Sequence, residues 1–259
     1  MNKILEIKNL SKKYHTKNGE IWAVKDFNAN IYENDFIAIV GPSGCGKSTI
    51  LSILSKLDTK TSGEVINHNK ALGYMLQNDA LFDWLTVLDN CLLGLKIQKK
   101  LTKENKEYVI DLINKYGLKD FINSYPSSLS GGMRQRVALI RTLATKPDIL
   151  LLDEPFSALD YQTRLSISND IYSILKQEKK SIILVTHDIA EAVSLCNRVI
   201  VLSKRPCIVK NVYNIELEKN INPIENRKDS KFNYYYNLIW KDIDYESWAK
   251  KIFKKNKNT

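Results

Sequence analysis

The sequence predicts an α/β fold with a mainly parallel sheet, and three short apolar runs carry this prediction. Residues 36–40, 149–152 and 182–185 are unbroken apolar runs, each about as long as one buried strand. Apolar residues at helical spacing follow the first run, over 47–57, and a helical stretch over 161–176 separates the second run from the third. Strands that alternate with helices along a chain indicate a mainly parallel sheet.

Other segments are predicted from alternation and from their turn residues. Ile4–Leu10 alternates apolar and polar residues, as a half-buried strand does, and Trp22–Ile31 is a second strand candidate after a turn near Gly19. After residue 203 the pattern gives way to Asn- and Lys-rich sequence. An aromatic stretch over 232–253 then has the character of a helix.

The stretch between the first two buried strands has a different character. Residues 78 to about 146 show mostly helical patterns, which we expect to be broken at Gly94, Gly117 and Pro126. The sequence shows no internal repeat and no Pro- or Gly-rich linker. The residue pattern therefore sets this stretch apart from the segments that alternate strands and helices.

Composition is ordinary for a globular protein, with 44% hydrophobic and 26% charged residues among 259. No apolar run approaches the roughly 18–20 residues that span a bilayer. The N-terminal residues lack the apolar core of a signal peptide, so we expect a cytosolic protein. The four cysteines lack metal-ligand spacing and are expected to be reduced thiols: Cys45, Cys91, Cys196 and Cys207.

The formal net charge of +10 is spread over many scattered lysines. A basic protein can bind nucleic acid, an anionic membrane surface or ATP. The lysines form no dense stripe, so we expect no nucleic-acid partner. The tail Lys250–Thr259 is the exception, with five lysines and no acid. We interpret it as a solvated chain end rather than as a lipid-binding segment.

A glycine-rich loop follows the first buried strand and fits the phosphate-loop pattern G-x-x-x-x-G-K-[ST]. Its glycines let backbone N–H groups surround the β- and γ-phosphates, and the following helix adds its partial positive charge. We expect Lys47 to bridge these two phosphates and Ser48 to ligate Mg²⁺. The loop consists of Gly41, Pro42, Ser43, Gly44, Cys45, Gly46, Lys47, Ser48 and Thr49.

Two carboxylates, Asp153 and Glu154, follow the second buried strand. We expect Asp153 to contact Mg²⁺ through water, and Glu154 to act as the general base that polarises the attacking water. A carboxylate pair at this place can also be only a helix cap. Pro155 and the segment Ser157–Asp160 disfavour that alternative.

Ser130, Gly131 and Gly132 open a predicted helix, so a second anion site is expected at that helix N-terminus. The surrounding residues Leu129–Gln135, Leu-Ser-Gly-Gly-Met-Arg-Gln, resemble the signature of the ATP-binding cassette family, whose ATPases power transporters. The resemblance covers nearly the whole chain.

This resemblance implies a phosphate-loop (P-loop) NTPase core with a mainly parallel sheet, an antiparallel β edge subdomain and an inserted helical subdomain at about 78–146. It implies one nucleotide-binding domain over 1–205, with 206–259 as a short C-terminal extension of the same domain. It also implies that two copies of the chain face each other head to tail and sandwich two ATP molecules. Ser130, Gly131 and Gly132 of one copy then contact the γ-phosphate held by the other.

Four further residues receive roles from the resemblance. Gln77 matches the glutamine whose side-chain oxygen reaches Mg²⁺ or the water, and His187 matches the switch histidine that contacts the γ-phosphate. Asp160 ends a segment that resembles the loop through which paired sites communicate. Tyr14 is expected to stack on adenine, with Trp22 as a competing candidate. His15 and His68 match no motif, and we expect them to be structural or exposed.

Three segments resemble one importer subgroup, that of nitrate, sulfonate and taurine: Leu81–Asn90, Ser128–Arg136 and the tail around Ile239-Trp240. Phe82-Asp83 stands where the subgroup usually has Leu-Pro, and Asn34-Asp35 where Gly-Glu is common. The resemblance implies an ATPase subunit bound to the cytoplasmic face of the membrane as a peripheral protein. Its partners are separate permease subunits and, indirectly, a solute-binding protein outside the cell.

The identity of the solute stays open at this point. A small anion such as nitrate or a sulfonate and a thiamine precursor are both served by this subgroup. A DNA-repair ATPase is an alternative, but such heads carry a long coiled coil between the Lys47 and Asp153 motifs, which this sequence lacks. A translation factor is another, but those proteins join two cassettes in one chain, and this chain has one.

Overall fold

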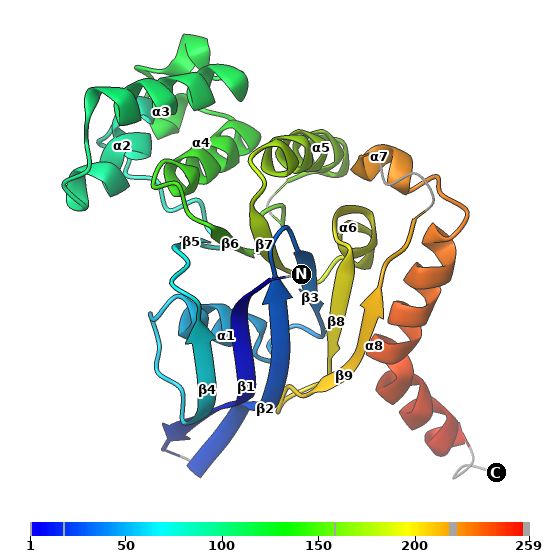
Figure 1. Cartoon of the computed structure of the whole chain (residues 1–259). Helices are drawn as coiled ribbons and strands as arrows, with labels where there is room; N and C mark the ends of the chain where they lie inside the picture. The colour runs from blue at the N-terminus through cyan, green and yellow to red at the C-terminus, as the bar shows by residue number, and fades with distance from the viewer. Residues whose placement is uncertain (1, 18, 158, 218–221, 256–259) are drawn as a thin grey trace. The chain divides into compact units, whose positions relative to one another are not determined.

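The computed structural model of the chain describes residues 2–17, 19–157, 159–217 and 222–255, without the side chains of residues 174 and 244–255. Figure 1 shows its helices and strands with the labels that are used in the text. The chain divides into two compact units. Unit 1 comprises residues 1–68 and 184–259, and unit 2 comprises residues 69–183.

Unit 1 contains a three-stranded antiparallel sheet. Its order is β2-β1-β4, formed by β1 (Lys3–Thr16), β2 (Gly19–Tyr32) and β4 (Ser62–Asn67). The predicted strands at 4–10 and 22–31 are thus confirmed and are longer than expected. The antiparallel β edge subdomain is confirmed as well, although β4 has no counterpart among the strands predicted from the residue pattern.

The parallel part of unit 1 leads into the phosphate loop. Here β3 (Phe36–Val40) runs parallel to β8 (Arg198–Leu202), with Ile37 opposite Arg198, and β9 (Val209–Asn214) continues the sheet antiparallel to β8. The predicted run at 36–40 is β3, and four of its five side chains are buried. Two helices accompany these strands, α1 (Lys47–Leu54) and α6 (Ile189–Leu195).

The C-terminal segment continues unit 1 as α7 (Pro223–Asn226) and α8 (Phe232–Lys255), and α8 confirms the predicted aromatic helix. Polar contacts attach α8 to β9, beside which it runs in Figure 1. Asn211 and Tyr213 both donate to the Asp242 carboxylate, each at 2.6 Å, and Lys210 donates to the Asp242 carbonyl at 2.7 Å. The basic side chains of the tail from Lys250 onward lie outside the described residues.

Unit 2 joins parallel strands to a group of helices. Strand β5 (Leu72–Met75) runs parallel to β6 (Ile149–Asp153), and β7 (Ser181–Thr186) lies next to β6. The boundary between the units falls inside β7, whose last residues belong to unit 1, where β7 neighbours β3. The helices are α2 (Val87–Ile97), α3 (Lys103–Lys115), α4 (Gly131–Leu143) and α5 (Tyr161–Gln177), with 3₁₀ turns at Lys119–Phe121 and Pro126–Ser128.

One predicted helix break in unit 2 is wrong. Helix α2 runs straight through Gly94. A Cβ atom at this position would lie 2.9 Å from the Thr145 methyl group, so the glycine allows α2 to pack closely against the residues that follow α4. Among the helices that the structure describes, none is both long and apolar enough to cross a membrane.

Candidate active site

The phosphate loop of unit 1 depends on two glycines with left-handed backbone angles. Gly44 has φ +70° and Gly46 has φ +133°, and a Cβ at Gly46 would lie only 2.6 Å from the Ala23 carbonyl oxygen. Helix α1 begins at the next residue, and its N-cap residue, Gly46, has no side chain to bond the first N–H groups. Donors at a helix N-terminus attract anions. The loop therefore offers backbone N–H groups where the predicted phosphates would bind.

Lys47 supplies the positive charge of this loop. Its side chain is buried, with 5% of the residue exposed, and its ammonium donates to the carbonyls of Gly41 at 2.9 Å and of Pro42 at 3.1 Å. Ser48 is exposed beside it. Cys45 is buried, and this burial raises the pKa of its thiol. At neutral pH the sulfur is thus a protonated, packed group rather than a reactive thiolate.

Arg205 and Cys207 also lie against the phosphate loop, and the residue pattern did not predict this. Arg205 donates to the Gly44 carbonyl at 2.7 Å. The Cys207 sulfur lies 3.1 Å from the position that a Cβ at Gly46 would occupy. No local pattern signals these contacts, because they join segments about 160 residues apart in the sequence.

Tyr14 of β1 is linked to the phosphate loop through its hydroxyl. This hydroxyl donates to Asp58 at 2.7 Å and also interacts with Thr49 of the loop, and its ring lies 4.8 Å from the Lys12 ammonium. Burial, followed by the bond to Asp58, raises the pKa of Tyr14. Trp22, the competing candidate, lies 5.2 Å from the ammonium of Lys13. Tyr14 thus contacts Thr49, a residue of the predicted phosphate loop, and its stacking on adenine stays a prediction.

His187, the other predicted residue of unit 1, lies exposed directly after β7. The next residue, Asp188, caps α6 by accepting bonds from the N–H groups of Ala190 at 2.8 Å and Glu191 at 3.1 Å. His187 therefore stands at a fixed turn between a buried strand and a capped helix. That place suits a residue that responds to a bound phosphate.

In unit 2 the two predicted carboxylates lie at the end of β6: Asp153 is its last residue, and Glu154 follows it. Asp153 is buried, with 3% of the residue exposed, and it accepts a hydrogen bond from the Tyr74 hydroxyl at 3.1 Å. Glu154 has φ +46°, a left-handed conformation that costs roughly 1–2 kcal/mol for a residue with a Cβ. Such strain gathers at functional sites. The Tyr74 contact was not predicted, and only its place one strand away from Asp153 could have indicated it.

Gln77 and Glu154 are brought together within unit 2. The Gln77 amide nitrogen lies 3.3 Å from Glu154 Oε2 and donates to it. The sequence predicts that the Gln77 oxygen reaches Mg²⁺ or the water, and the donated bond adds a second role. Gln77 thus holds the carboxylate that is the candidate general base, and the contact of its amide oxygen with Mg²⁺ or the water stays a prediction.

The signature turn of unit 2 is Leu129–Gly132 at the start of α4. Ser130 is the N-cap, and its hydroxyl accepts the N–H of Met133 at 3.3 Å. A Cβ at Gly131 would meet no atom closer than 3.7 Å, whereas a Cβ at Gly132 would lie 2.6 Å from the Ile167 side chain. Packing within this chain therefore explains why residue 132 is a glycine, but it does not explain why residue 131 is one.

This difference yields a first prediction. We expect Gly132→Ala to lower the midpoint of thermal unfolding, because the ends of the Ile167 and Thr163 side chains must move, at a cost of about 1 kcal/mol, the low end of the overpacking range. Gly131→Ala should leave the midpoint unchanged, because its Cβ would make only an ordinary contact of 3.7 Å with Leu159. It should instead weaken ATP-dependent dimer formation, because the added methyl group would stand where we expect the γ-phosphate of the second copy's ATP. Thermal melts and sedimentation with ATP measure both. Equal loss of stability in the two variants would contradict this account of Gly131.

Asp160, the last predicted residue of unit 2, stands directly before α5. Its carboxylate accepts the N–H of Thr163 at 3.1 Å, and this bonding to Thr163 lowers the pKa of Asp160. Asp160 is therefore an exposed helix cap that stays ionised at neutral pH. Ala158, in the same predicted segment, lies outside the described residues.

The predicted site residues thus fall into two groups. Unit 1 holds Tyr14, residues 41–49 and His187, and unit 2 holds Gln77, residues 130–132, Asp153, Glu154 and Asp160. Within the part of the chain that the structure describes, no cluster of three or more His, Cys, Asp or Glu side chains could hold a metal ion by itself.

Comparison with known proteins places the chain among transporter ATPases. The family model described as "ABC transporter" matches residues 24–157. The chain is 36% identical to the aliphatic sulfonates import ATP-binding protein SsuB of Bacillus thuringiensis, over 88% of this chain and 91% of that one. It is 39% identical to the nitrate import ATP-binding protein NrtD of Synechocystis, over 86% of each.

A further relative has a different solute in its name. This is the formylaminopyrimidine import ATP-binding protein ThiZ of Halalkalibacterium halodurans, which is 41% identical over 68% of this chain and 71% of its own. Among solved structures, the dimeric ATP-binding cassette MJ0796, in a post-hydrolysis state bound to ADP and Pi, has a TM-score of 0.71 and 32% identity. The match covers 82% of this chain and 99% of that one.

Proposed function

Because the chain belongs to the ATP-binding cassette (ABC) transporter family, we propose that it is the ATP-hydrolysing subunit of an importer for a small anion of the sulfonate or nitrate kind. The observation that carries the ATPase is Glu154, a strained carboxylate held by Gln77 at the end of β6. The phosphate loop with its buried Lys47 supports the same function from unit 1. The import direction and the solute class rest on the names of the relatives.

We assign the steps of hydrolysis to the chain's own residues. The N–H groups of residues 41–49 and the ammonium of Lys47 bind the β- and γ-phosphates, and Tyr14 supports the adenine. Glu154 polarises the attacking water while Gln77 holds its carboxylate. His187 contacts the γ-phosphate. Loss of this phosphate when ATP becomes ADP therefore changes the contacts of the residue that lies directly before the N-cap of α6.

Mg²⁺ belongs to this proposal as a cofactor. Hydroxyl, carboxylate and amide oxygens are ligands that Mg²⁺ accepts, so Ser48, Asp153 and Gln77 have the right chemistry to hold it. When bound, the ion neutralises charge on the phosphates. The buried Asp153 carboxylate, already oriented by the Tyr74 hydroxyl, fits a role at a fixed position.

A second copy of the chain completes each site. Ser130, Gly131 and Gly132 of one copy meet the γ-phosphate held by the other, and Asp160 lies in the segment that joins the two sites. The dimeric relative MJ0796 supports this arrangement, and so does Gly131, where a Cβ would make only an ordinary contact of 3.7 Å with Leu159. ATP then favours the closed pair and ADP the open one, and this difference in affinity drives motion in the partner proteins.

Those partners would be permease subunits, with a solute-binding protein acting on their far side. We place the chain as a peripheral protein on the cytoplasmic face of the membrane. In domain terms, residues 1–205 are the nucleotide-binding domain with its helical part at about 78–146. Residues 206–259 are a short C-terminal extension of the same domain. Formylaminopyrimidine uptake is the second candidate function, favoured by the similarity to ThiZ.

The permease-docking surface that we propose is the aromatic pair Phe82 and Trp84, just before α2. The two rings lie 4.9 Å apart between centroids, and Trp84 is 72% exposed. An exposed tryptophan beside a second aromatic ring is typical of a binding hot spot. Because both rings lie in the segment that follows Gln77, a partner seated on them would be linked to the catalytic glutamate.

Substituting Trp84 tests this surface. We expect Trp84→Ala to weaken binding to native membranes by about 30-fold, because a hot-spot residue contributes about 2 kcal/mol or more. Hydrolysis by the isolated protein should stay within about two-fold of wild type, as for other surface substitutions. The matched control is Ile97→Ala, since Ile97 is 73% exposed at the end of α2. If basal hydrolysis collapses with Trp84→Ala, this residue is part of the packing and not a docking surface.

A solute assay separates the candidate functions. Cells that lack the chain should lose growth on an alkanesulfonate as sulfur source or on nitrate as nitrogen source, and recover it with the chain but not with Glu154→Gln. If growth depends instead on a supplied aminopyrimidine, the second candidate function is correct. If neither changes, the proposed solute class is wrong.

A further inference from the structure

The segment that carries the proposed docking surface is held from within unit 2. We name residues 78–86, between Gln77 and α2, the connector. Asn90 of α2 is fully buried and binds it from one side, accepting the N–H of Phe82 at 2.9 Å. The Asn90 amide also donates to the carbonyls of Phe82, Leu85 and Thr86 at 3.0–3.1 Å. One buried side chain thus fixes the backbone beneath the exposed aromatic pair.

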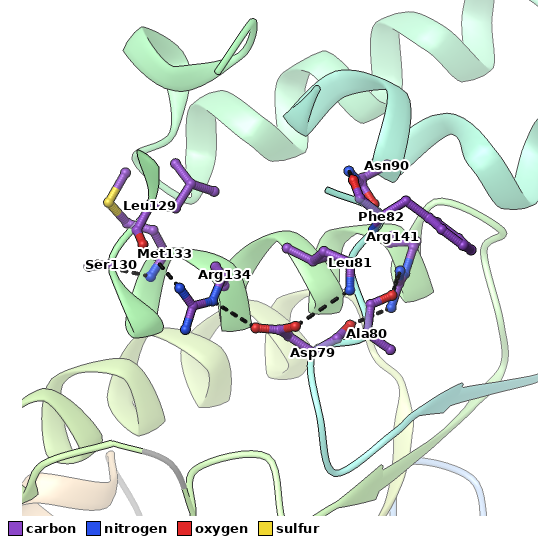
Figure 2. Close-up of polar contacts among 10 residues, drawn as sticks. All are labelled: Asp79, Ala80, Leu81, Phe82, Asn90, Leu129, Ser130, Met133, Arg134 and Arg141. Atoms are coloured by element: carbon purple, nitrogen blue, oxygen red, sulfur yellow. Dashed lines mark hydrogen bonds and ion pairs between the residues drawn. The ribbon is translucent and has the colours of Figure 1, made fainter. Parts of the chain in front are cut away.

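Two arginines of α4 hold the other end of the connector (Figure 2). Arg141 donates to the carbonyls of Asp79 at 2.6 Å and Ala80 at 2.7 Å, and Arg134 Nε donates to the Asp79 carboxylate at 2.9 Å. The other oxygen of this carboxylate accepts the N–H of Leu81 at 3.4 Å. Ala80 has φ +46°, so these contacts hold the connector in a strained turn.

Arg134 differs from Arg141 because it has a second partner outside the connector. Its Nη1 donates to the carbonyl of Leu129 at 3.3 Å, directly before Ser130 in the signature turn. Figure 2 shows the Arg134 side chain between Asp79 and the signature turn, of which Leu129 and Ser130 are labelled. One guanidinium group therefore touches both the connector and the turn that we expect to contact the second copy's ATP.

The geometry of α4 makes this contact specific to one helix face. Arg134 and Arg141 are seven positions apart, which brings them to the same side of an α-helix. Arg136 is offset from Arg134 by about 200° and faces other partners. It donates to the Tyr116 carbonyl at 3.2 Å and to the Asp170 carboxylate at 2.9 Å. The two ion pairs have the same length, but only the one at Arg134 reaches the connector.

We propose that Arg134 is a positioning residue that couples occupancy of the docking surface to the signature turn, with the Asp79 carboxylate as its partner on the connector. This inference rests on the proposed function, because it presumes a permease seated on Phe82 and Trp84. A shift of the connector moves Asp79, and Arg134 passes the shift to the Leu129 carbonyl and thus to Ser130. The pair is partly exposed, at 41% for Arg134 and 27% for Asp79, so it adds little to stability and suits a contact that changes.

The test compares hydrolysis with and without native membranes stripped of the endogenous subunit. The readout is the ratio of the two rates, because a general loss of fold lowers both and leaves the ratio unchanged. We expect Arg134→Ala and Asp79→Ala each to reduce this ratio about five-fold or more, as loss of a typical coupling does. The double variant should be no worse than either single one, since both remove the same contact. Exchanging the charges, with Asp79→Arg and Arg134→Asp together, should not restore the ratio, because an aspartate side chain cannot donate to the Leu129 carbonyl.

Arg136→Ala is the matched control and should keep the wild-type ratio. The inference is overturned if Arg134→Ala keeps the wild-type ratio, if the losses of the single variants multiply in the double one, or if Arg136→Ala loses as much. Arg134→Gln replaces Arg134→Ala if a thermal melt shows that the alanine variant is unfolded. Wild-type protein that native membranes do not stimulate would contradict the proposed function, and this inference would fall with it. Stimulated wild type with equally stimulated variants contradicts this inference alone.

Discussion

Glu154→Gln is expected to abolish ATP hydrolysis while ATP still binds. Removing a general base lowers a rate by about 10²–10⁴-fold, and glutamine keeps the size of the side chain at the end of β6. The groups that we propose to bind the phosphates stay in place, because neither the loop at 41–49 nor the signature turn contains Glu154. The variant should therefore accumulate as a dimer in ATP, with a γ-phosphate that it cannot remove.

Two measurements check this prediction: phosphate release, and sedimentation at micromolar protein with and without ATP. Glu178→Gln is the control, since Glu178 lies in the same unit and pairs with Lys115 at 3.8 Å. A Glu154→Gln protein that stays monomeric in ATP contradicts the two-copy site. A variant that hydrolyses ATP at the wild-type rate shows that Glu154 is not the base, and its left-handed backbone would then need another explanation.

Lys47→Ala should have the second large effect, on ATP binding itself. The ammonium is buried at the loop, where a charged hydrogen bond contributes about 1.5–3 kcal/mol. Loss of the bonds that we propose it makes to two phosphates should weaken ATP binding by on the order of 100-fold or more, given about 1.4 kcal/mol per ten-fold. Titration calorimetry with ATP measures this directly. Lys60→Ala is the control, because Lys60 is exposed and donates only to the Gly63 carbonyl at 2.9 Å. Unchanged affinity in Lys47→Ala would remove the lysine from the phosphate site.

The parts of the fold that the sequence predicted well are those with a local signal. Unbroken apolar runs mark β3, β6 and β7, and helical spacing marks α5, because burial on both sides or on one face leaves a regular pattern. The phosphate loop was predictable for the same reason, since its glycines and lysine follow each other directly. Strand β9 was missed because its neighbours are Asn- and Lys-rich, and only pairing with β8 defines it.

The contacts that refine the site could not be predicted in this way. Arg205 reaches Gly44, Tyr74 reaches Asp153, and Arg134 reaches Asp79 across separations of 161, 79 and 55 residues. A short sequence pattern cannot indicate contacts between residues so far apart in the sequence. Gly94 shows the opposite error: glycine usually weakens a helix, and here close packing against Thr145 overrides that preference. Neither the sequence pattern nor the structure identifies the solute, because the residues proposed to bind ATP have the same chemistry whatever is transported.

The most direct test of the central claim is recovery of partners from native membranes. Glu154→Gln protein is incubated with these membranes and ATP, extracted in mild detergent and captured, and the proteins that co-purify are identified by mass spectrometry. Recovery of a multi-span permease in ATP, and its absence with Trp84→Ala in the same protein, is the result we predict. Recovery of ribosomes or DNA without a membrane protein would contradict the importer function and leave only the ATPase.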